Sequence, residues 1–459
     1  MPKKSFILVL LLCFSSIIAF AQETPTGTEQ PEQEKPFFSF ALGIALGYDS
    51  FGGTEGYQKL ALKPDFGFGE FGIGLELTLH YRFVDGELEV RREDWVPEGD
   101  RTFWDLYLPI FRYIRYGQKG KPLYAKLGSI DDMTLGNGYI MANYSNSLFM
   151  PETRIIGFNF DLDGQLFDFP LFGLETVIGN VAALDVIGAR LYLRPLVFFD
   201  IPVFRYLMLG ATFVVDRQPF RYVTDAYALG EGFTDPDSEL AQAFGIDFRQ
   251  PLLTEAPVTL ALYGDVVWLN GGKAIGGMTG FGGKLIDLFI YNFQFRVNGE
   301  NFIPVYFDAT YDISRAVKYP LVENGDAPAY LGWYASIGAE IFEVFTIQIG
   351  LDGPFQEVDS ADPDNYLNYP HLRGVLTLKP GLIPGLSADF IYDKTMLGRH
   401  DGFFADLFYP EGAVISVKVN YQFGPAVITL LYDIRYVPDG TGNPWVVTSG
   451  LESSVVIPF

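Results

Sequence analysis

Apolar and polar residues alternate along most of the chain, most clearly from residue 413 to the C-terminus. Between 413 and 423 the odd positions carry Ala, Ile, Val, Val, Tyr and Phe, whereas the even positions include Ser416, Lys418 and Asn420. Two further alternating runs follow the Gly424–Pro425 turn. A period of two predicts β-strands. These runs exceed the roughly five or six residues of typical strands, and a tilted strand needs about ten residues to cross a bilayer.

Similar runs begin near Phe38 and continue along the whole chain. In 71–84 the charged side chains occupy one face only, and the same alternation predicts strands at 289–297, 305–313 and 331–341. In a membrane barrel the apolar face meets lipid and the polar face lines a wet lumen. We therefore expect the charged face of each strand to point inward.

The connections between the runs are of two kinds. Short ones include Gly69–Glu70 and Ile286–Asp287, while long acidic ones include 85–100, 216–240 and 352–370. Outer-membrane barrels have the same asymmetry, with short periplasmic turns and long extracellular loops. The alternation of short and long connections therefore favours an antiparallel transmembrane barrel.

The fold class predicted from these runs is all-β, with a single closed antiparallel transmembrane β-barrel over residues 38–459. The sequence contains 21 candidate strands, but a barrel with both ends in the periplasm has an even number. One run is therefore counted in excess, and we place it within 257–313, where the connections stop alternating cleanly in length. We expect about 20 strands, or 16 to 18 if short runs such as 59–68 belong to loops.

The N-terminus has the features of an export signal. Two lysines precede an apolar run at 6–20, and an Ala-Phe-Ala cleavage site follows at 19–21. We predict a signal peptide over residues 1–21. Residues 22–37 are rich in Glu, Pro, Thr and Gln, and this composition predicts a disordered periplasmic leader.

The chain's one cysteine, Cys13, lies inside the predicted signal peptide. Cleavage would therefore leave an exported chain that depends on packing or sheet closure rather than on disulfides. Cys13 could also be read as a lipoprotein acceptor, but Leu12 stands where that signal has a small residue.

The C-terminal strand carries a resemblance to a known class. The chain ends on Phe459, and Leu451, Val455 and Ile457 alternate before it, although Ser453 departs from the pattern. This ending resembles that of bacterial outer-membrane β-barrel proteins of the porin-like kind. The resemblance implies location in the outer membrane, contact with its lipid, and Phe459 as a signal read by the barrel-assembly machinery.

Composition narrows the range of partners. Aromatic residues make up 16% of the chain, which suits aromatic girdles at membrane interfaces. The formal net charge is −24, so a nucleic-acid partner is not expected.

The loop at 131–151 differs from the other long connections because it carries no charge after its first two residues. In general porins, which this class resembles, a loop of this size folds into the lumen and narrows the pore. The alternative is a loop that covers the barrel mouth or packs on its rim. Its candidate constriction residues are Asp131, Asp132, Asn137, Asn143 and Asn146.

Charged residues of both signs fall on the polar face of the predicted strands. They either line a pore or form ion pairs that stiffen the wall. Arg190 and Arg194 lie four residues apart on one strand and are our candidate anion-contacting pair. The candidate pore-lining residues are Arg82, Lys126, Arg190, Arg194, Asp308, Asp312, Glu340, Lys418 and Arg435.

The sequence gives little support for catalysis, a metal or a cofactor. The chain has three histidines, no Gly-x-Ser-x-Gly motif, no zinc-ligand spacing and no phosphate-binding loop. The Asp-rich segment at 359–364 lacks the spacing of an EF-hand. We therefore expect neither an enzyme nor a bound cofactor or metal.

These features predict a porin-like channel for passive or weakly selective diffusion of small hydrophilic solutes. Two alternatives remain open: a substrate-specific transporter, for example of hydrophobic ligands, and a surface-exposed interaction barrel. A homo-oligomer is compatible with each of the three. Conductance in planar bilayers would separate the first from the other two.

Overall fold

The computed structural model describes residues 38–51, 55–97, 102–150, 154–221, 239–255, 257–325, 328–342, 344–358, 366–409, 412–424, 426–436 and 445–458. The predicted signal peptide, the leader, the Asp-rich segment 359–364 and Phe459 lie outside the described residues. The described residues all belong to one unit, Phe37–Phe459.

Twenty-two strands form one sheet, in which the pairings are antiparallel. The strands are β1 (Phe38–Phe51), β2 (Glu55–Phe68), β3 (Phe71–Leu75), β4 (Leu77–Val84), β5 (Glu87–Val90), β6 (Phe111–Tyr116), β7 (Leu123–Gly128), β8 (Gly157–Asp163), β9 (Phe172–Ile178), β10 (Val186–Leu193), β11 (Met208–Asp216), β12 (Ala241–Leu253), β13 (Leu260–Leu269), β14 (Ala274–Leu285), β15 (Phe289–Asn298), β16 (Tyr330–Ile341), β17 (Phe345–Pro354), β18 (His371–Leu378), β19 (Leu386–Lys394), β20 (Ala413–Phe423), β21 (Ala426–Tyr436) and β22 (Trp445–Pro458).

Helices are few among the described residues. The α-helices are α2 (Phe103–Tyr107), α3 (Tyr311–Asn324) and α4 (Phe403–Asp406), and the short 3-10 helices include η1 (Arg92–Asp94) and η4 (Phe204–Tyr206). None of the helices in this part of the chain is both long and apolar enough to cross a membrane.

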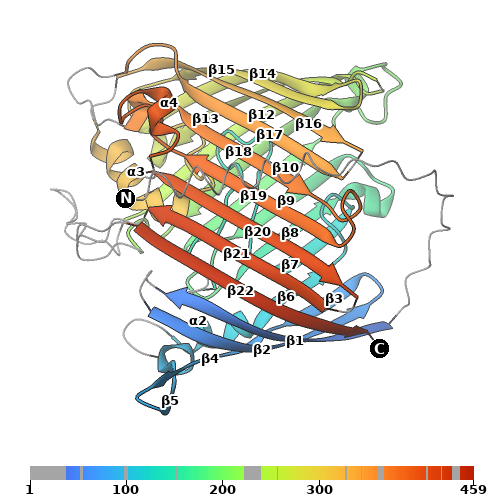
Figure 1. Cartoon of the computed structure of the whole chain (residues 1–459). Coiled ribbons are helices and arrows are strands. Elements are labelled where there is room, and N and C mark those ends of the chain that lie inside the picture. The colour runs from blue at the N-terminus through green and yellow to red at the C-terminus, as the bar shows by residue number, and fades with distance from the viewer. Residues whose placement is uncertain are drawn as a thin grey trace. The chain divides into compact units, whose positions relative to one another are not determined.

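Most strands pair with their neighbours in the sequence, and the exceptions lie near the N-terminus. β3 and β4 both pair with β2, β6 follows β3 in the sheet, and β5 forms a hairpin with β4. The first and last strands are also neighbours, because β1 pairs with β22 from Ala41 to Asp49. Figure 1 shows β1 and β2, in blue, beside the dark red β22.

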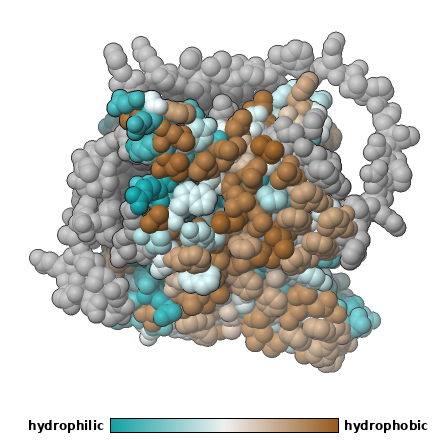
Figure 2. Space-filling view, turned by 90° about the horizontal axis from the view of Figure 1, so that it is seen from below, coloured by the Kyte–Doolittle hydropathy of each residue, from teal (hydrophilic) through white to brown (hydrophobic). Residues whose placement is uncertain are grey.

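The two faces of the strands differ as the alternation predicts. On β10, Leu191 and Leu193 are 52% and 45% exposed, whereas Arg190 and Tyr192 between and beside them are buried. On β12, Ile246 is 48% exposed, whereas the neighbouring Asp247 is buried. Figure 2 shows apolar side chains over much of the described surface that it presents. We call the two surfaces of the sheet its apolar face and its polar face.

The strand predicted at 305–313 is wrong. Residues 305–310 form turns interrupted by a single β-bridge at Phe307, and α3 occupies 311–324. The Asp308 carboxylate accepts a 2.9 Å hydrogen bond from the Thr310 backbone N–H, which is a turn rather than an extended conformation. The alternating apolar residues of this run include Phe307 and Tyr311, which pack into a hydrophobic core and are not part of a strand.

A hydrophobic core lies against the polar face of β9–β14. It is built from two connections, which we call the inward loop (129–150) and the α3 segment (299–325), and together the plug. Met141 and Phe307, both fully buried, join the two parts in a β-bridge. The core therefore fills space on the side of the sheet that carries the polar residues.

The face assignment gives a direct test in lipid vesicles. Replacing Ile246 with Arg places a charge on the apolar face and should lower the free energy of unfolding by ~2–4 kcal/mol. The matched control is Thr429→Arg on β21, which adds the same side chain to the polar face and should be tolerated. Equal losses of stability in urea titrations of the two variants would contradict the assignment.

Candidate functional site

A cavity of about 1200 Å³ lies between the plug and the polar face of β1, β2, β4 and β17–β21, with further residues from β6 and β7. Helix α2 and the residues before it also contribute to its lining. The charged residues of the lining are Asp49, Asp65, Glu76, Asp94, Asp105, Asp131, Asp132, Asp389, Asp393, Asp433, Lys59, Lys63, Arg112, Lys126, Arg154, Arg373, Lys418 and Arg435.

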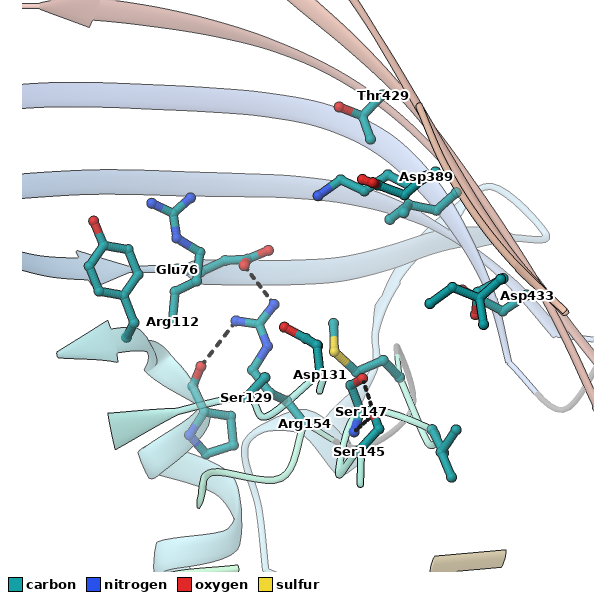
Figure 3. A pocket seen from close by; sticks show the side chains of 18 of the residues that line it. Glu76, Arg112, Ser129, Asp131, Ser145, Ser147, Arg154, Asp389, Thr429 and Asp433 are labelled. Atoms are coloured by element: carbon teal, nitrogen blue, oxygen red, sulfur yellow. Dashed lines mark hydrogen bonds and ion pairs between the residues drawn. The ribbon is translucent and has the colours of Figure 1, made fainter. Parts of the chain in front are cut away.

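Glu76 is the centre of the charged wall formed by β1–β4. It stands where β3 ends and β4 begins, and its backbone N–H donates to Ile110 rather than to a strand partner. The interruption brings its carboxylate to the Arg154 guanidinium at 2.6 Å, with the Lys63 ammonium 3.6 Å away. Arg154 also donates to the Pro109 carbonyl oxygen. Figure 3 shows the Glu76–Arg154 pair at the edge of the cavity.

The chain of ion pairs continues along this wall. The Lys59 ammonium lies 3.2 Å from the Asp49 carboxylate. The imidazole of His80 contacts Asp49 with one nitrogen at 3.0 Å and Asp94 with the other at 2.7 Å. The charges of this wall therefore largely neutralise one another.

The opposite wall, formed by β18–β21, leaves charges less completely paired. Arg373 donates to Asp393 at 2.7 Å, and Asp433 accepts a hydrogen bond from Ser416. Asp389 and Lys418 stand opposite each other in the β19–β20 register, yet neither forms an ion pair with a described residue. Figure 3 shows Asp389 and Asp433 across the cavity from the Glu76–Arg154 pair.

The third side of the cavity is the edge of the inward loop. Asp131, Asp132, Asn143, Ser145 and Ser147 line it. Ser145 and Ser147 are hydrogen-bonded to each other through their hydroxyls at 2.9 Å. The two carboxylates form no ion pair with any residue that the structure describes, although the Lys119 ammonium donates to the Asp132 backbone carbonyl at 2.8 Å, and both carboxylates line the cavity.

Glycines of the wall create the space in which the plug packs. A Cβ at Gly276 would lie 2.4 Å from the Phe302 ring, and one at Gly245 would lie 2.9 Å from the Ile140 side chain. Neither contact is sterically possible without movement, so a larger residue would displace the plug. Glycine at these positions thus permits the close approach of loop and wall.

Polar contacts fix the inward loop to the same wall. Asn137 donates to the Phe248 carbonyl and to the Asp265 carboxylate at 3.1 and 3.0 Å. Tyr139 donates to the Asn298 side chain at 2.7 Å. The buried Asn146 accepts from the Ile130 backbone N–H and donates to the Gly179 carbonyl. Asn137 and Asn146 therefore act as anchors of the loop, whereas Asn143 faces the cavity.

The α3 segment is held by buried charges. Arg315, 1% exposed, contacts Asp185 and Asp216 at the ends of β10 and β11, and Asp312 on its own helix at 2.7 Å. Burial raises the pKa of the Asp312 carboxyl to about 7, against the opposing effect of the Arg315 charge. Asp308, which lies just before α3, pairs with Lys318 of that helix. Asp308 and Asp312, two of the predicted pore-lining residues, therefore form ion pairs inside the plug.

Four other predicted pore-lining residues lie away from the described lining of the cavity. Arg190 is buried against Asp247 and Glu175, and Arg194 pairs with Asp163 at 2.6 Å. Arg82 pairs with Glu89 in the β4–β5 hairpin, and Glu340 pairs with Lys284 beside short turns. Carboxylates thus pair with both guanidinium groups, and the interpretation of Arg190 and Arg194 as an anion-contacting pair stays a prediction.

The remaining predicted residues do face the cavity: Lys126, Lys418, Arg435, Asp131, Asp132 and Asn143. Sequence reasoning missed Lys59, Lys63 and Arg154. In the alternating pattern of β2 the two lysines fall on the polar face, so this pattern could have identified them. Arg154 lies in a loop, where the period-two pattern gives no orientation.

A search of solved structures finds chains from Pseudomonas aeruginosa that align with most of this chain. Pseudomonas aeruginosa OprD aligns at 9% identity over 92% of this chain and 94% of its own, with a TM-score of 0.33. OpdK of the same organism, solved with vanillate, aligns at 9% identity over 92% and 99%, with a TM-score of 0.34. OccK2 (OpdF), solved with glucuronate, aligns at 8% identity over 92% and 95%, with a TM-score of 0.31. A scan of protein-family models and a search of curated proteins find no match.

The buried charges of the plug give a stability prediction. Arg315→Met would leave Asp185, Asp216 and Asp312 without their shared cation, which should cost about 3–5 kcal/mol in urea unfolding. Lys273→Met, which removes an exposed pair with Glu323, should cost about 0–1 kcal/mol.

The loss in Arg315→Met should depend on pH. Because the Arg315 charge lowers the pKa of the buried Asp312 carboxyl, Arg315→Met should raise that pKa further, and protonation then removes the buried charge that the variant leaves without its cation. The variant should therefore be closer to the parent below about pH 7 than above it. A deficit that grows on acidification would contradict the role given to these carboxylates.

Proposed function

We propose that the chain forms a closed β-barrel of 20 transmembrane strands in the bacterial outer membrane. Of the 22 strands, β3 and β4 count as one interrupted strand, and β5 lies in a hairpin beyond it. The β1–β22 pairing supports closure, and the exposed apolar residues support contact with lipid. Short turns would face the periplasm and long connections the outside. The polar face is then the lumen.

We infer that the barrel is a channel for small hydrophilic solutes and that they pass through the cavity. The observation that carries this inference is the lining, which brings charged residues from three sides to one space of about 1200 Å³. The plug fills the part of the lumen beside β9–β14. Solutes would therefore diffuse down their gradient between the plug and the β1–β4 and β17–β21 walls.

The lining favours weak cation preference. It contains ten carboxylates and eight lysines or arginines. Asp131, Asp132 and Asp389 have no described ion-pair partner, but neither has Lys418, so the preference rests on the excess of two carboxylates over the basic residues of the lining. A fixed negative field in a narrow space raises the local concentration of cations.

The two alternatives find less support. A transporter of hydrophobic ligands needs an apolar site, whereas the core beside the cavity is already filled by the plug's own side chains. A surface-interaction barrel would use the long loops and would need no open lumen. Contacts with the barrel-assembly machinery through Phe459, and assembly into a homo-oligomer, stay predictions from the sequence.

Ion preference tests the proposed channel. In planar bilayers under a salt gradient, the parent should conduct with a reversal potential that favours cations. Replacing Asp131 and Asp132 with Asn should move the reversal potential toward that of an unselective pore, because two negative charges of the lining are lost.

Asp200→Asn is the matched control. Its carboxylate is fully exposed in the connection between β10 and β11, outside the described lining, so the ion preference should stay that of the parent. A folded parent that carries no current would contradict the channel and favour the surface-interaction alternative.

A further inference from the structure

The inward loop contacts two opposite parts of the sheet. Its first part packs on β10–β14 through residues such as Ile140. Its later part reaches β21, and β13 to β20 stand between β12 and β21 in the order of pairing. We propose that Arg435 is a positioning residue that holds the far limb of this loop, residues 147–150, across the cavity and so sets the width of the channel. This inference rests on the proposed function.

The contacts of Arg435 with the loop are specific. Its Nη1 donates to the carbonyl oxygens of Leu148 and Met150, at 2.7 and 3.1 Å. The guanidinium carbon lies 5.8 Å from the centre of the Phe149 ring between them. Hydrogen bonds from a charged donor are stronger than neutral ones, and only 3% of Arg435 is exposed. The side chain thus holds three consecutive residues of the limb.

The position of Arg435 makes these contacts matter for the channel. It lies near the end of β21, opposite Val414 of β20, and Arg435, Leu148 and Met150 all line the cavity. Its described hydrogen bonds go to backbone carbonyls, so they tie the chain path of the loop to the wall. A shift of the limb would change the cross-section available to a solute.

The limb is held independently on either side of this contact. Before it, Asn146 donates to the Gly179 carbonyl at 2.6 Å. After it, Arg154 pairs with Glu76. Tyr139 and Tyr144 are buried in the core of the plug. Loss of the Arg435 contacts should therefore release residues 147–150 without unfolding the plug.

The test compares Arg435→Met, Arg435→Lys and Arg82→Met in planar bilayers and in liposome-swelling assays with neutral sugars of increasing size. Met keeps an unbranched apolar stem but removes the donors and is shorter than Arg, whereas Lys keeps a cationic donor on a stem of closer length. Arg82→Met is the matched control, because Arg82 pairs with Glu89 outside the described lining. Heat-modifiable mobility on gels identifies folded protein, and Arg435→Gln replaces Arg435→Met if the latter does not fold.

We expect Arg435→Met to admit larger neutral sugars than the parent and to conduct more. Arg435→Lys should lie near the parent, and Arg82→Met should match it. Neutral sugars separate release of the limb from loss of a charge, because a charge alone does not change the size limit for an uncharged solute. A folded Arg435→Met variant with the parent's size limit would overturn the inference and leave the channel intact. A silent parent would overturn the proposed function itself.

Discussion

The backbone bonds between the inward loop and the α3 segment hold the interior of this protein together. The Val305 and Phe307 N–H groups donate to the carbonyls of Tyr139 and Ile140, and Ala142 donates back to Phe307. A buried connection needs such partners, because unpaired peptide groups are costly away from water. Two loops that would each be unstable alone therefore form one plug, and the remaining space becomes the cavity.

The sheet divides into two halves with different tasks. The wall at β9–β14 presents small residues to the plug, and Gly245 and Gly276 allow contact closer than any side chain would permit. The walls at β1–β4 and β17–β21 present long charged side chains to open space instead. Paired charges around Glu76 stiffen one wall, and the less paired Asp389 and Lys418 give the other its polar surface.

The sequence was sufficient to predict the strands and their faces, because a period of two follows from strand geometry alone. It also indicated that the inward loop is unusual, since the loop lacks charge after Asp132. It could not predict that α3 is a helix, because residues 305–313 alternate as a strand would while their partners lie elsewhere in the chain. Likewise Arg190 meets Asp247, 57 residues away, and no local pattern reveals such a partner.

Our central claim is that water and solutes pass beside the plug and not through it. Thiol accessibility tests this claim most directly, in Thr429→Cys at the cavity and Ala243→Cys beneath the plug. The chain's one cysteine, Cys13, lies in the predicted signal peptide and should not interfere. A charged water-soluble thiol reagent added during current recording should reduce the current of Thr429→Cys and leave that of Ala243→Cys unchanged. Block of Ala243→Cys without any effect on Thr429→Cys would contradict the account.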